Sequence, residues 1–347
     1  MKAVVKMHDG VGGWVVKEMT REDPGPKDVE IQIKAIGICG SELHLYHDNH
    51  FYTPGTIVGH EFSGVISRVG SEVTEWRVGD RVISENHRTA CGECEYCKTG
   101  HPMFCKDRKS MGYATNGGWA EYTLMPARLL LKIPDNVTYE EASMTEPCTI
   151  VINALCFRAP VQAGGTILVQ GAGTIGMLAA MVAKAAGAGK VILTGTEIDR
   201  EVRLPIARKL KQIDEIIDVS SSDLYQEIMA RTDGNGVDMV VEASGAVTAI
   251  NEAIRLVKKT GRIVAIGEAA SEKIEFTWNA AIFRACDITF TYGAEYESWK
   301  LALQFMSDGM IDLQPMITHR LLLSEFHEGF KLLETKKGIK VILYPED

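Results

Sequence analysis

Four cysteines lie within a fifteen-residue stretch, at a C-x2-C-x2-C-x7-C spacing that suits a metal ion. They are Cys91, Cys94, Cys97 and Cys105. A C-x2-C turn lets two sulfurs converge on one ion, and the other pair completes a tetrahedral shell, as zinc prefers. An iron–sulfur cluster takes the same ligands and remains an alternative. Because four protein ligands leave no open position, we expect this site to hold a loop in place and the chemistry to occur elsewhere.

A second set of potential metal ligands is spread over the chain up to residue 148. Residues 37–44 read G-I-C-G-S-E-L-H, residues 58–64 read V-G-H-E-F-S-G, and residues 145–148 read T-E-P-C. Each residue alone is weak evidence, since a lone cysteine commonly packs as a small hydrophobe. Together, one thiolate, one imidazole and one carboxylate would suit zinc with an open coordination position. The candidates are Cys39, Ser41, His44, His60, Glu61 and Glu146.

The stretch from residue 166 has the order of strand, glycine turn and helix that binds a dinucleotide. It reads T-I-L-V-Q-G-A-G-T-I-G, followed by a run without helix breakers. In G-x-G-x-x-G the first glycine permits a tight turn, the second lets backbone approach a pyrophosphate, and the third lets helix pack on strand. The helix N-terminus then presents free N–H groups to the phosphates. The candidate cofactor-binding residues are Gly171, Gly173, Thr174, Ile175 and Gly176.

The end of the next strand bears on the choice between NAD and NADP. NAD sites usually carry an acidic residue there, which accepts a hydrogen bond from the ribose 2′-OH. This chain has Gly195 at that point and Glu197 two residues later. Glu197 could take the acidic role from a displaced position, or Gly195 could leave space for a 2′-phosphate that Arg200 or Arg203 neutralises. We favour NAD.

Further strand candidates alternate with helical segments beyond the glycine turn. This alternation predicts an α/β fold with a doubly wound parallel sheet. We expect strands at 190–194, 216–219, 238–243, 262–267 and 287–291, and helices that include 201–211 and 247–259. The last strand would be an exposed edge, and such an edge invites pairing with a second subunit.

Length and composition limit the class of protein. A chain of 347 residues exceeds the size at which single cores stop growing, so we expect two domains. The formal net charge of −9 argues against nucleic acid or an anionic membrane surface as partner. Neither an apolar N-terminal signal nor a run of about eighteen apolar residues is present. We therefore expect a cytoplasmic protein with reduced cysteines rather than disulfides.

The order of these motifs resembles the medium-chain, zinc-dependent alcohol and polyol dehydrogenase superfamily over nearly the whole chain. The matching motifs are G-x-C-G-S-x-x-H, G-H-E-x-x-G, the four-cysteine loop, G-G-W-A-E-Y at 117–122, E-P, and G-A-G-x-I-G. The stretches 234–245 and 261–267 also resemble the cofactor domain of that family. The resemblance implies a GroES-like catalytic domain, here 1–155 with 296–347, around a Rossmann domain at 156–295. The active site would lie in the cleft where they meet.

The resemblance also implies roles for individual residues. Cys39, His60 and either Glu61 or Glu146 would surround a catalytic zinc, with Ser41 and His44 in a proton relay. Where liver-type alcohol dehydrogenases carry a second cysteine, this chain has Glu146 in the context E-P-C-T-I, the pattern of polyol and threonine dehydrogenases. We therefore favour a carboxylate-ligated zinc. We expect the nearby Cys148 to pack in the core.

The expected function is zinc-dependent transfer of a hydride between a secondary alcohol and NAD(P), with a polyol or sugar alcohol as substrate. The alternatives are L-threonine, a diol or a sugar phosphate as substrate, and a non-catalytic nucleotide-sensing protein. We expect a dimer or tetramer, and the resemblance favours a tetramer. Four aromatic residues could line a pocket but are expected in the core: Phe51, Trp119, Phe283 and Trp299.

Overall fold

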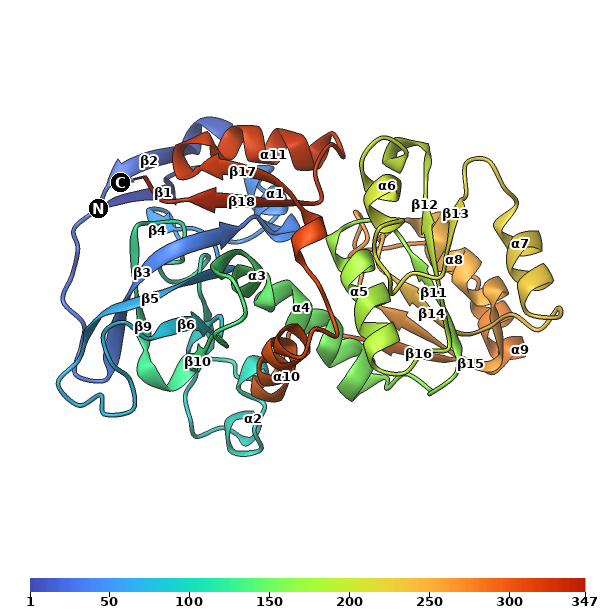
Figure 1. Ribbon diagram of the computed structural model, residues 1–347, viewed down its shortest axis with the longest axis horizontal. Helices are drawn as coiled ribbons and strands as arrows, with labels where there is room; N and C mark the ends of the chain where they lie inside the picture. The colour runs from blue at the N-terminus through green and yellow to red at the C-terminus, as the bar shows by residue number, and fades with distance from the viewer. Residues whose placement is uncertain (347) are drawn as a thin grey trace. The chain divides into compact units, whose positions relative to one another are not determined.

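The computed structural model describes residues 1–346 and divides the chain into two units, each described separately here (Figure 1). The first unit comprises Met1–Pro147, Glu295–Ser307 and the C-terminal part from Ile317. The second comprises Cys148–Ala294 and Asp308–Met316. The division expected from the sequence differs at three places, since 148–155 and 308–316 belong to the second unit and residue 295 to the first.

The second unit is built on a six-stranded sheet in the order β13-β12-β11-β14-β15-β16, in which all neighbours are parallel. This is the strand order of a dinucleotide-binding fold, in which the direction of strand addition switches between β11 and β14. Ile167, Leu168 and Val169 of β11 are fully buried, as expected for a central parallel strand covered on both faces. The expected α/β sheet is confirmed. The strands are β11 (Thr166–Gln170), β12 (Lys190–Gly195), β13 (Glu215–Asp218), β14 (Val237–Glu242), β15 (Val257–Ala265) and β16 (Asp287–Phe290).

Two of the helices expected in this unit are shorter than predicted. The segment 201–211 is helical only over α6 (Arg203–Ala207), and the segment 247–259 only over α8 (Val247–Leu256). Val257 starts β15 instead, because it pairs with Val237 of β14. The other helices are α5 (Thr174–Ala185), α7 (Leu224–Arg231) and α9 (Trp278–Arg284). Within residues 1–346, no helix is long and apolar enough to cross a membrane.

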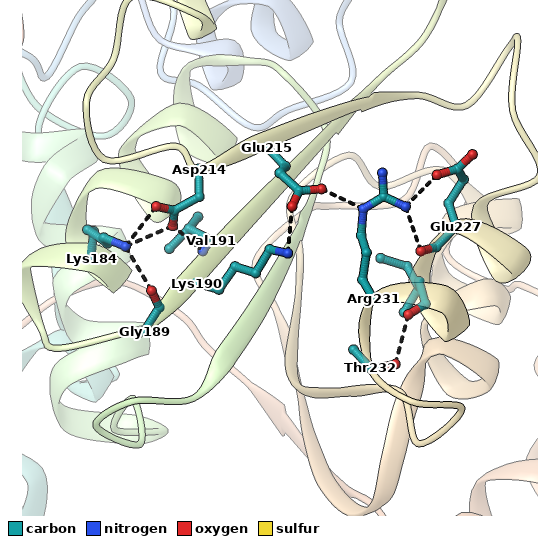
Figure 2. A network of polar contacts seen from close by, with 10 residues as sticks. Lys184, Gly189, Lys190, Val191, Asp214, Glu215, Glu227, Arg231 and Thr232 are labelled. Carbon is teal, nitrogen blue, oxygen red and sulfur yellow. Dashed lines mark hydrogen bonds and ion pairs between the residues drawn. The ribbon is translucent and has the colours of Figure 1, made fainter.

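Ion pairs connect the edge strand β13 to its neighbours (Figure 2). The Asp214 carboxylate, just before β13, accepts hydrogen bonds from Lys184 of α5 at 2.8 Å and from the backbone N–H of Val191 at 2.7 Å. Glu215 pairs with Lys190 of β12 and with Arg231 of α7, each at 2.5 Å. The side chains are about one-third exposed, so each pair contributes little alone. Together they link β13 to a strand and two helices.

The first unit is mainly β-structure. Its main sheet has the order β10-β6-β5-β3-β18-β17, with β9 also paired to β3, and a smaller sheet has the order β2-β1-β4. The long strand β3 pairs with β5 on one side and with β18 on the other, so both ends of the chain build one core. The main-sheet strands are β3 (Asp28–Gly37), β5 (Phe62–Val69), β6 (Arg81–Ser84), β9 (Tyr122–Pro126), β10 (Leu130–Lys132), β17 (Ile317–Leu322) and β18 (Lys340–Tyr344). The other strands are β1 (Lys2–Lys6), β2 (Trp14–Glu18), β4 (Thr56–Ile57), and the separate pair β7 (His87–Thr89) and β8 (Lys109–Ser110).

The helices of this unit are short, apart from two near the C-terminus. They are α1 (Gly40–Tyr46), α2 (Glu95–Lys98), α3 (Tyr139–Ser143), α10 (Tyr296–Ser307) and α11 (Phe326–Glu334), and α4 (Thr145–Ile152) leads from this unit into the second. The expected core positions of Trp119 and Trp299 are confirmed, with both nearly fully buried. The same expectation is wrong for Phe51 and Phe283, which are 62% and 79% exposed.

Candidate active site

The four-cysteine loop brings its sulfur atoms together as the spacing predicts. Potential ligand atoms of all four lie within 4.8 Å of one another, with Cys91 Sγ 3.9 Å from Cys97 Sγ and 3.5 Å from Cys105 Sγ. Sulfurs about 2.3 Å from a tetrahedral zinc are about 3.8 Å apart, so these separations fit zinc. The backbone N–H groups of Glu93 and Cys94 lower the pKa of Cys91 to about 6, which favours the thiolate that a metal requires.

Strand pairing brings Cys39 and His60 to the same end of the main sheet. Cys39 follows β3 and His60 precedes β5, and these strands are antiparallel with Ile36 opposite Phe62. Gly59 has φ 90°, and a Cβ there would lie 1.8 Å from Trp119 Cδ1. Only glycine therefore fits at this turn, which presents the His60 side chain beside Cys39.

Glu42 is a buried carboxylate at this site that the sequence analysis did not select. Its Oε2 accepts a hydrogen bond from the Cys39 backbone N–H at 2.7 Å, which caps α1. Its Oε1 lies 2.7 Å from His60 Nδ1. A carboxylate on one ring nitrogen orients a metal-binding histidine and leaves the other nitrogen for the ion. Glu42 could have been identified from the sequence as an acidic residue three positions after Cys39, in the first turn of a helix.

The two candidate carboxylate ligands have different partners. Glu61 pairs through Oε2 with the ammonium of Lys340, which also donates to the Ile38 carbonyl at 2.9 Å. The other oxygen of Glu61, Oε1, is buried and has no hydrogen-bond partner among the described residues. Glu146 accepts a hydrogen bond on Oε1 from the Asn86 side-chain amide at 2.8 Å. Sequence analysis found neither Lys340 nor Asn86, because nothing in their local sequence relates them to the acids.

Potential ligand atoms gather in two groups that share His60. Cys39, Glu42 and His60 form one, and His60, Glu61 and Glu146 form the other; in each, the atoms lie within 4.8 Å of one another. Cys39 and the two predicted carboxylates are therefore brought to the same imidazole, although no single group contains all of them.

The electrostatics of this site favour a bound cation. Burial raises the pKa of Glu146 to about 7, and the charge of Glu61 adds to this effect while His60 opposes it. Burial also raises the pKa of Cys39, helped by Glu61. Burial lowers the pKa of His60, but the charge of Glu42 together with Tyr113 and the hydrogen bond to Cys39 outweighs it, and the net shift is upward. Several buried acids face one another with Lys340 as fixed cation, and buried charge without enough counter-charge is costly. A zinc ion would supply that charge, so the donor set fits it.

The predicted relay residues both lie on α1. Ser41 is half-buried and accepts a hydrogen bond from the hydroxyl of Tyr113 at 2.8 Å, a partner that sequence analysis missed. His44 is one helical turn away and exposed to solvent. Residues three apart share one face of a helix, which is the arrangement that a relay toward solvent would need. The relay itself stays a prediction.

The glycine turn in the second unit has the geometry of a dinucleotide site. Gly171 has φ 108°, which favours glycine, and a Cβ on Gly176 would lie 1.8 Å from the Gly171 carbonyl oxygen. Gly173 is the N-cap of α5, and Thr174 and Ile175 are its first residues, so the positive end of the helix dipole lies at this turn. The turn can therefore receive a pyrophosphate.

The residues after β12 show which side chains are available to the adenosine ribose. A Cβ on Gly195 would lie 2.5 Å from Leu204 Cδ2 and 3.4 Å from Asp199 Oδ2, so an acid at this position would have to displace the Leu204 side chain and would face the charge of Asp199. Glu197 is exposed in the next turn. Arg200 pairs with Asp218 at 2.5 Å, and Arg203 lies 3.5 Å from Asp199. Both arginines therefore already have a carboxylate partner.

Comparison with known proteins agrees with this architecture. Residues 25–135 match the alcohol dehydrogenase GroES-like domain, and residues 174–308 match the zinc-binding dehydrogenase domain. The chain is 35% identical over 347 residues to a sorbitol dehydrogenase of Halalkalibacterium halodurans, covering all of both chains. It is also 35% identical over 349 residues to an L-threonine 3-dehydrogenase of Rhizobium etli, covering 99% of this chain and 98% of the relative.

A solved structure shows the same fold over nearly the full length. The crystal structure of a zinc-binding dehydrogenase from Sinorhizobium meliloti 1021, bound to NADP, superimposes with a TM-score of 0.91 at 28% identity and covers 99% of each chain. The expected pairing of a GroES-like domain with a Rossmann domain is thus confirmed.

Proposed function

Because the chain belongs to the family of zinc-binding alcohol dehydrogenases with a GroES-like domain, we propose that it oxidises a secondary alcohol of the polyol or sugar-alcohol class with NAD(P). The observation that carries this proposal is the gathering of Cys39 and two buried glutamates around His60, in a chain that also contains a dinucleotide turn. A polyol panel tests it. The absorbance of the reduced cofactor should rise in the presence of a polyol, and the absence of any such rise with zinc and cofactor bound would contradict it.

We propose two zinc ions per subunit, one in the four-cysteine loop and one held by Cys39, His60 and either Glu61 or Glu146. The second ion, when bound, supplies a Lewis acid that polarises the oxygen of the alcohol. Lys340 neutralises part of the charge of Glu61, whereas Asn86 orients Glu146 without neutralising it. Glu61 keeps one oxygen without a hydrogen-bond partner among the described residues, and Glu146 is held by an amide, so either acid could serve as the third ligand.

The proposed proton path starts at Ser41 and ends at His44. Oxidation of an alcohol removes a hydride from carbon, which the nicotinamide accepts, and a proton from oxygen. Ser41 is a hydroxyl two residues after Cys39, and His44 is an exposed imidazole, a group that commonly shuttles protons. A hydroxyl followed by an imidazole can therefore carry the proton toward solvent.

We propose NAD as the preferred cofactor. Arg200 and Arg203 are paired with Asp218 and Asp199, so neither is a free cation for a 2′-phosphate. Glu197 is exposed and places a negative charge where a 2′-phosphate would be repelled. A steady-state comparison should give a higher kcat/KM with NAD than with NADP. Asp218→Asn, which frees Arg200, should raise the value for NADP; a wild-type preference for NADP would contradict this assignment.

L-Threonine is the second candidate substrate, because the identity to a threonine dehydrogenase equals that to a sorbitol dehydrogenase. Diols and sugar phosphates belong in the same panel. A non-catalytic nucleotide-sensing protein is the candidate of a different class; it would bind cofactor and show no turnover with any of these compounds.

We also propose a homo-oligomer in the cytoplasm, either a dimer or a tetramer. All eight cysteines are free thiols, and the four-cysteine loop needs them reduced. In the second unit β16 is an edge strand, and exposed aromatic side chains accompany it, with Phe290 75% and Trp278 69% exposed. An apolar cavity of about 850 Å³ lies beside them. A second copy of the chain would pair this edge and cover the aromatic residues.

A further inference from the structure

Tyr113 connects the relay hydroxyl to a metal-binding histidine in a way that the proposed function does not use. Tyr113 is buried, with 7% of its surface exposed, and its hydroxyl donates to Ser41 Oγ at 2.8 Å. Its ring centroid lies 5.5 Å from that of His60, at an interplanar angle of 34°. The ring also contacts His50, at 4.4 Å and 30°.

The backbone holds Tyr113 in this place. Gly112 has φ 80°, and a Cβ there would lie 2.8 Å from the backbone nitrogen of Gly59, the residue before His60. The Tyr113 carbonyl accepts a hydrogen bond from the Thr53 N–H at 2.8 Å. Gly112 packs directly on the turn that presents His60, so this backbone contact fixes the position of Tyr113 relative to His60.

The direction of the hydrogen bond determines what the Ser41 hydroxyl can do. A serine hydroxyl has one hydrogen and two acceptor lone pairs, and a tyrosine hydroxyl is protonated at neutral pH. Donation from Tyr113 occupies one lone pair of Ser41. The hydrogen of Ser41 must then point away from Tyr113, and one lone pair remains. Ser41 is left with one donor and one acceptor, as a proton carrier requires.

We propose that Tyr113 is a positioning residue for the dehydrogenase reaction, which acts by fixing the orientation of the Ser41 hydroxyl. The role rests on the proposed alcohol oxidation. The alcohol carbon gives up a hydride to NAD(P), and the proton of the alcohol oxygen goes to the free lone pair of Ser41 while Ser41 passes its own hydrogen to the next acceptor. Without Tyr113 the Ser41 hydroxyl can rotate, and this transfer becomes less frequent.

The test is a double-mutant cycle of Tyr113→Phe and Ser41→Ala in the zinc-loaded enzyme. Tyr113→Phe keeps the ring and removes the hydroxyl. It should lower kcat about tenfold, as misorientation of a reacting group does, with zinc content and the KM for cofactor unchanged. In the Ser41→Ala background the same change should have no further effect, because the residue acts through Ser41. The matched control is Tyr52→Phe, whose hydroxyl donates to Asp9 at 2.7 Å and which should keep the wild-type kcat.

A second readout does not depend on activity. The midpoints of urea unfolding of the same four proteins should be non-additive, because either single change breaks the one hydrogen bond. Additive midpoints, an unchanged kcat in Tyr113→Phe, or an equal loss of kcat in the Ser41→Ala background would each overturn the role of Tyr113. A wild-type enzyme without alcohol-dependent turnover would instead contradict the proposed function, and this role with it.

Discussion

Cys39 and Cys94 are both proposed zinc ligands, but they occupy different surroundings. Cys39 lies in a buried group with His60, and Cys94 lies in a mostly exposed loop together with three other cysteines. Cys39→Ala should therefore abolish turnover and leave cofactor binding intact. Cys94→Ala should chiefly lower stability or assembly, since metal binding in such a loop is part of folding. Activity assays, cofactor titration and thermal unfolding separate the two effects.

Either of two results would count against this division of roles. One is residual activity in Cys39→Ala. The other is an equal loss of folding from both substitutions, which would show that the two metal sites had been assigned the wrong functions.

Glu85 provides a prediction about pH. Its carboxyl is buried, and burial together with the charge of Glu295 raises its pKa to about 7. The native state thus favours the neutral acid, and this contribution to stability is complete below the ordinary pKa of 4.5 and is lost as pH rises through about 7. Glu85→Gln keeps the neutral shape. The free energy of unfolding of Glu85→Gln, relative to that of wild type, should increase by on the order of 2 kcal/mol between pH 5 and pH 8.

Urea unfolding at several pH values measures this gain. The exposed Glu297→Gln, on the first turn of α10, is the matched control and should show no such trend. A stability difference between Glu85→Gln and wild type that does not change with pH would refute the shifted pKa.

At this scale residue type and spacing predicted much of the candidate site. Cys39, His60, Glu61 and Glu146 stand in recognisable motifs; strand pairing brings the first three to one end of the sheet, and α4 places Glu146 beside His60 and Glu61. Their partners Lys340 and Asn86 could not be predicted, because they reach the site from distant strands and loops. Burial also determines the pKa of a carboxylate, and the burial of an individual glutamate cannot be predicted from the sequence alone.

Among the elements, the glycine turn before α5 makes the strictest demand on sequence. A Cβ on Gly176 would meet the Gly171 carbonyl oxygen at 1.8 Å, and backbone atoms cannot move aside cheaply. Gly176→Val should therefore push α5 away from β11, with a loss of cofactor affinity of at least tenfold and lower stability. Fluorescence titration with NADH measures the affinity.

The matched control for this turn is Gly164→Ala, at a surface position of the same unit where nothing lies near the added carbon. Its φ of 78° costs some stability, but cofactor affinity should remain. If Gly176→Val bound NADH as tightly as wild type, the turn would not be the pyrophosphate site.

Strand positions were easier to predict than helix ends. All the expected strands of the second unit appear, most of them within one residue of their predicted bounds, but β15 begins at Val257, five residues before the predicted start at 262. The helix expected over 247–259 ends early because Val257 gains a strand partner in Val237. The boundary between helix and strand therefore depends on a pairing partner that is distant in sequence, which the local periodicity of the chain cannot predict.

For the whole molecule, the exposed edge at β16 predicts assembly. Phe290→Lys puts a charge on an edge strand, which opposes pairing with another copy. Light scattering should give at least twice the chain mass for wild type and a lower mass for the variant. Val78→Lys, an equally non-conservative change at a 63% exposed position of the first unit, is the control. A wild-type monomer, or a variant with unchanged mass, would remove β16 as the interface.

We propose that an open zinc site at Cys39, His60 and a glutamate carries out the reaction, while the four-cysteine loop is structural. The most direct measurement is zinc content per subunit together with activity in wild type and in His60→Ala. We predict two zinc ions and alcohol-dependent turnover for wild type, and one zinc ion, a folded chain and no turnover for His60→Ala. If His60→Ala retained two zinc ions, or turned over fully with one, His60 would not hold a catalytic zinc.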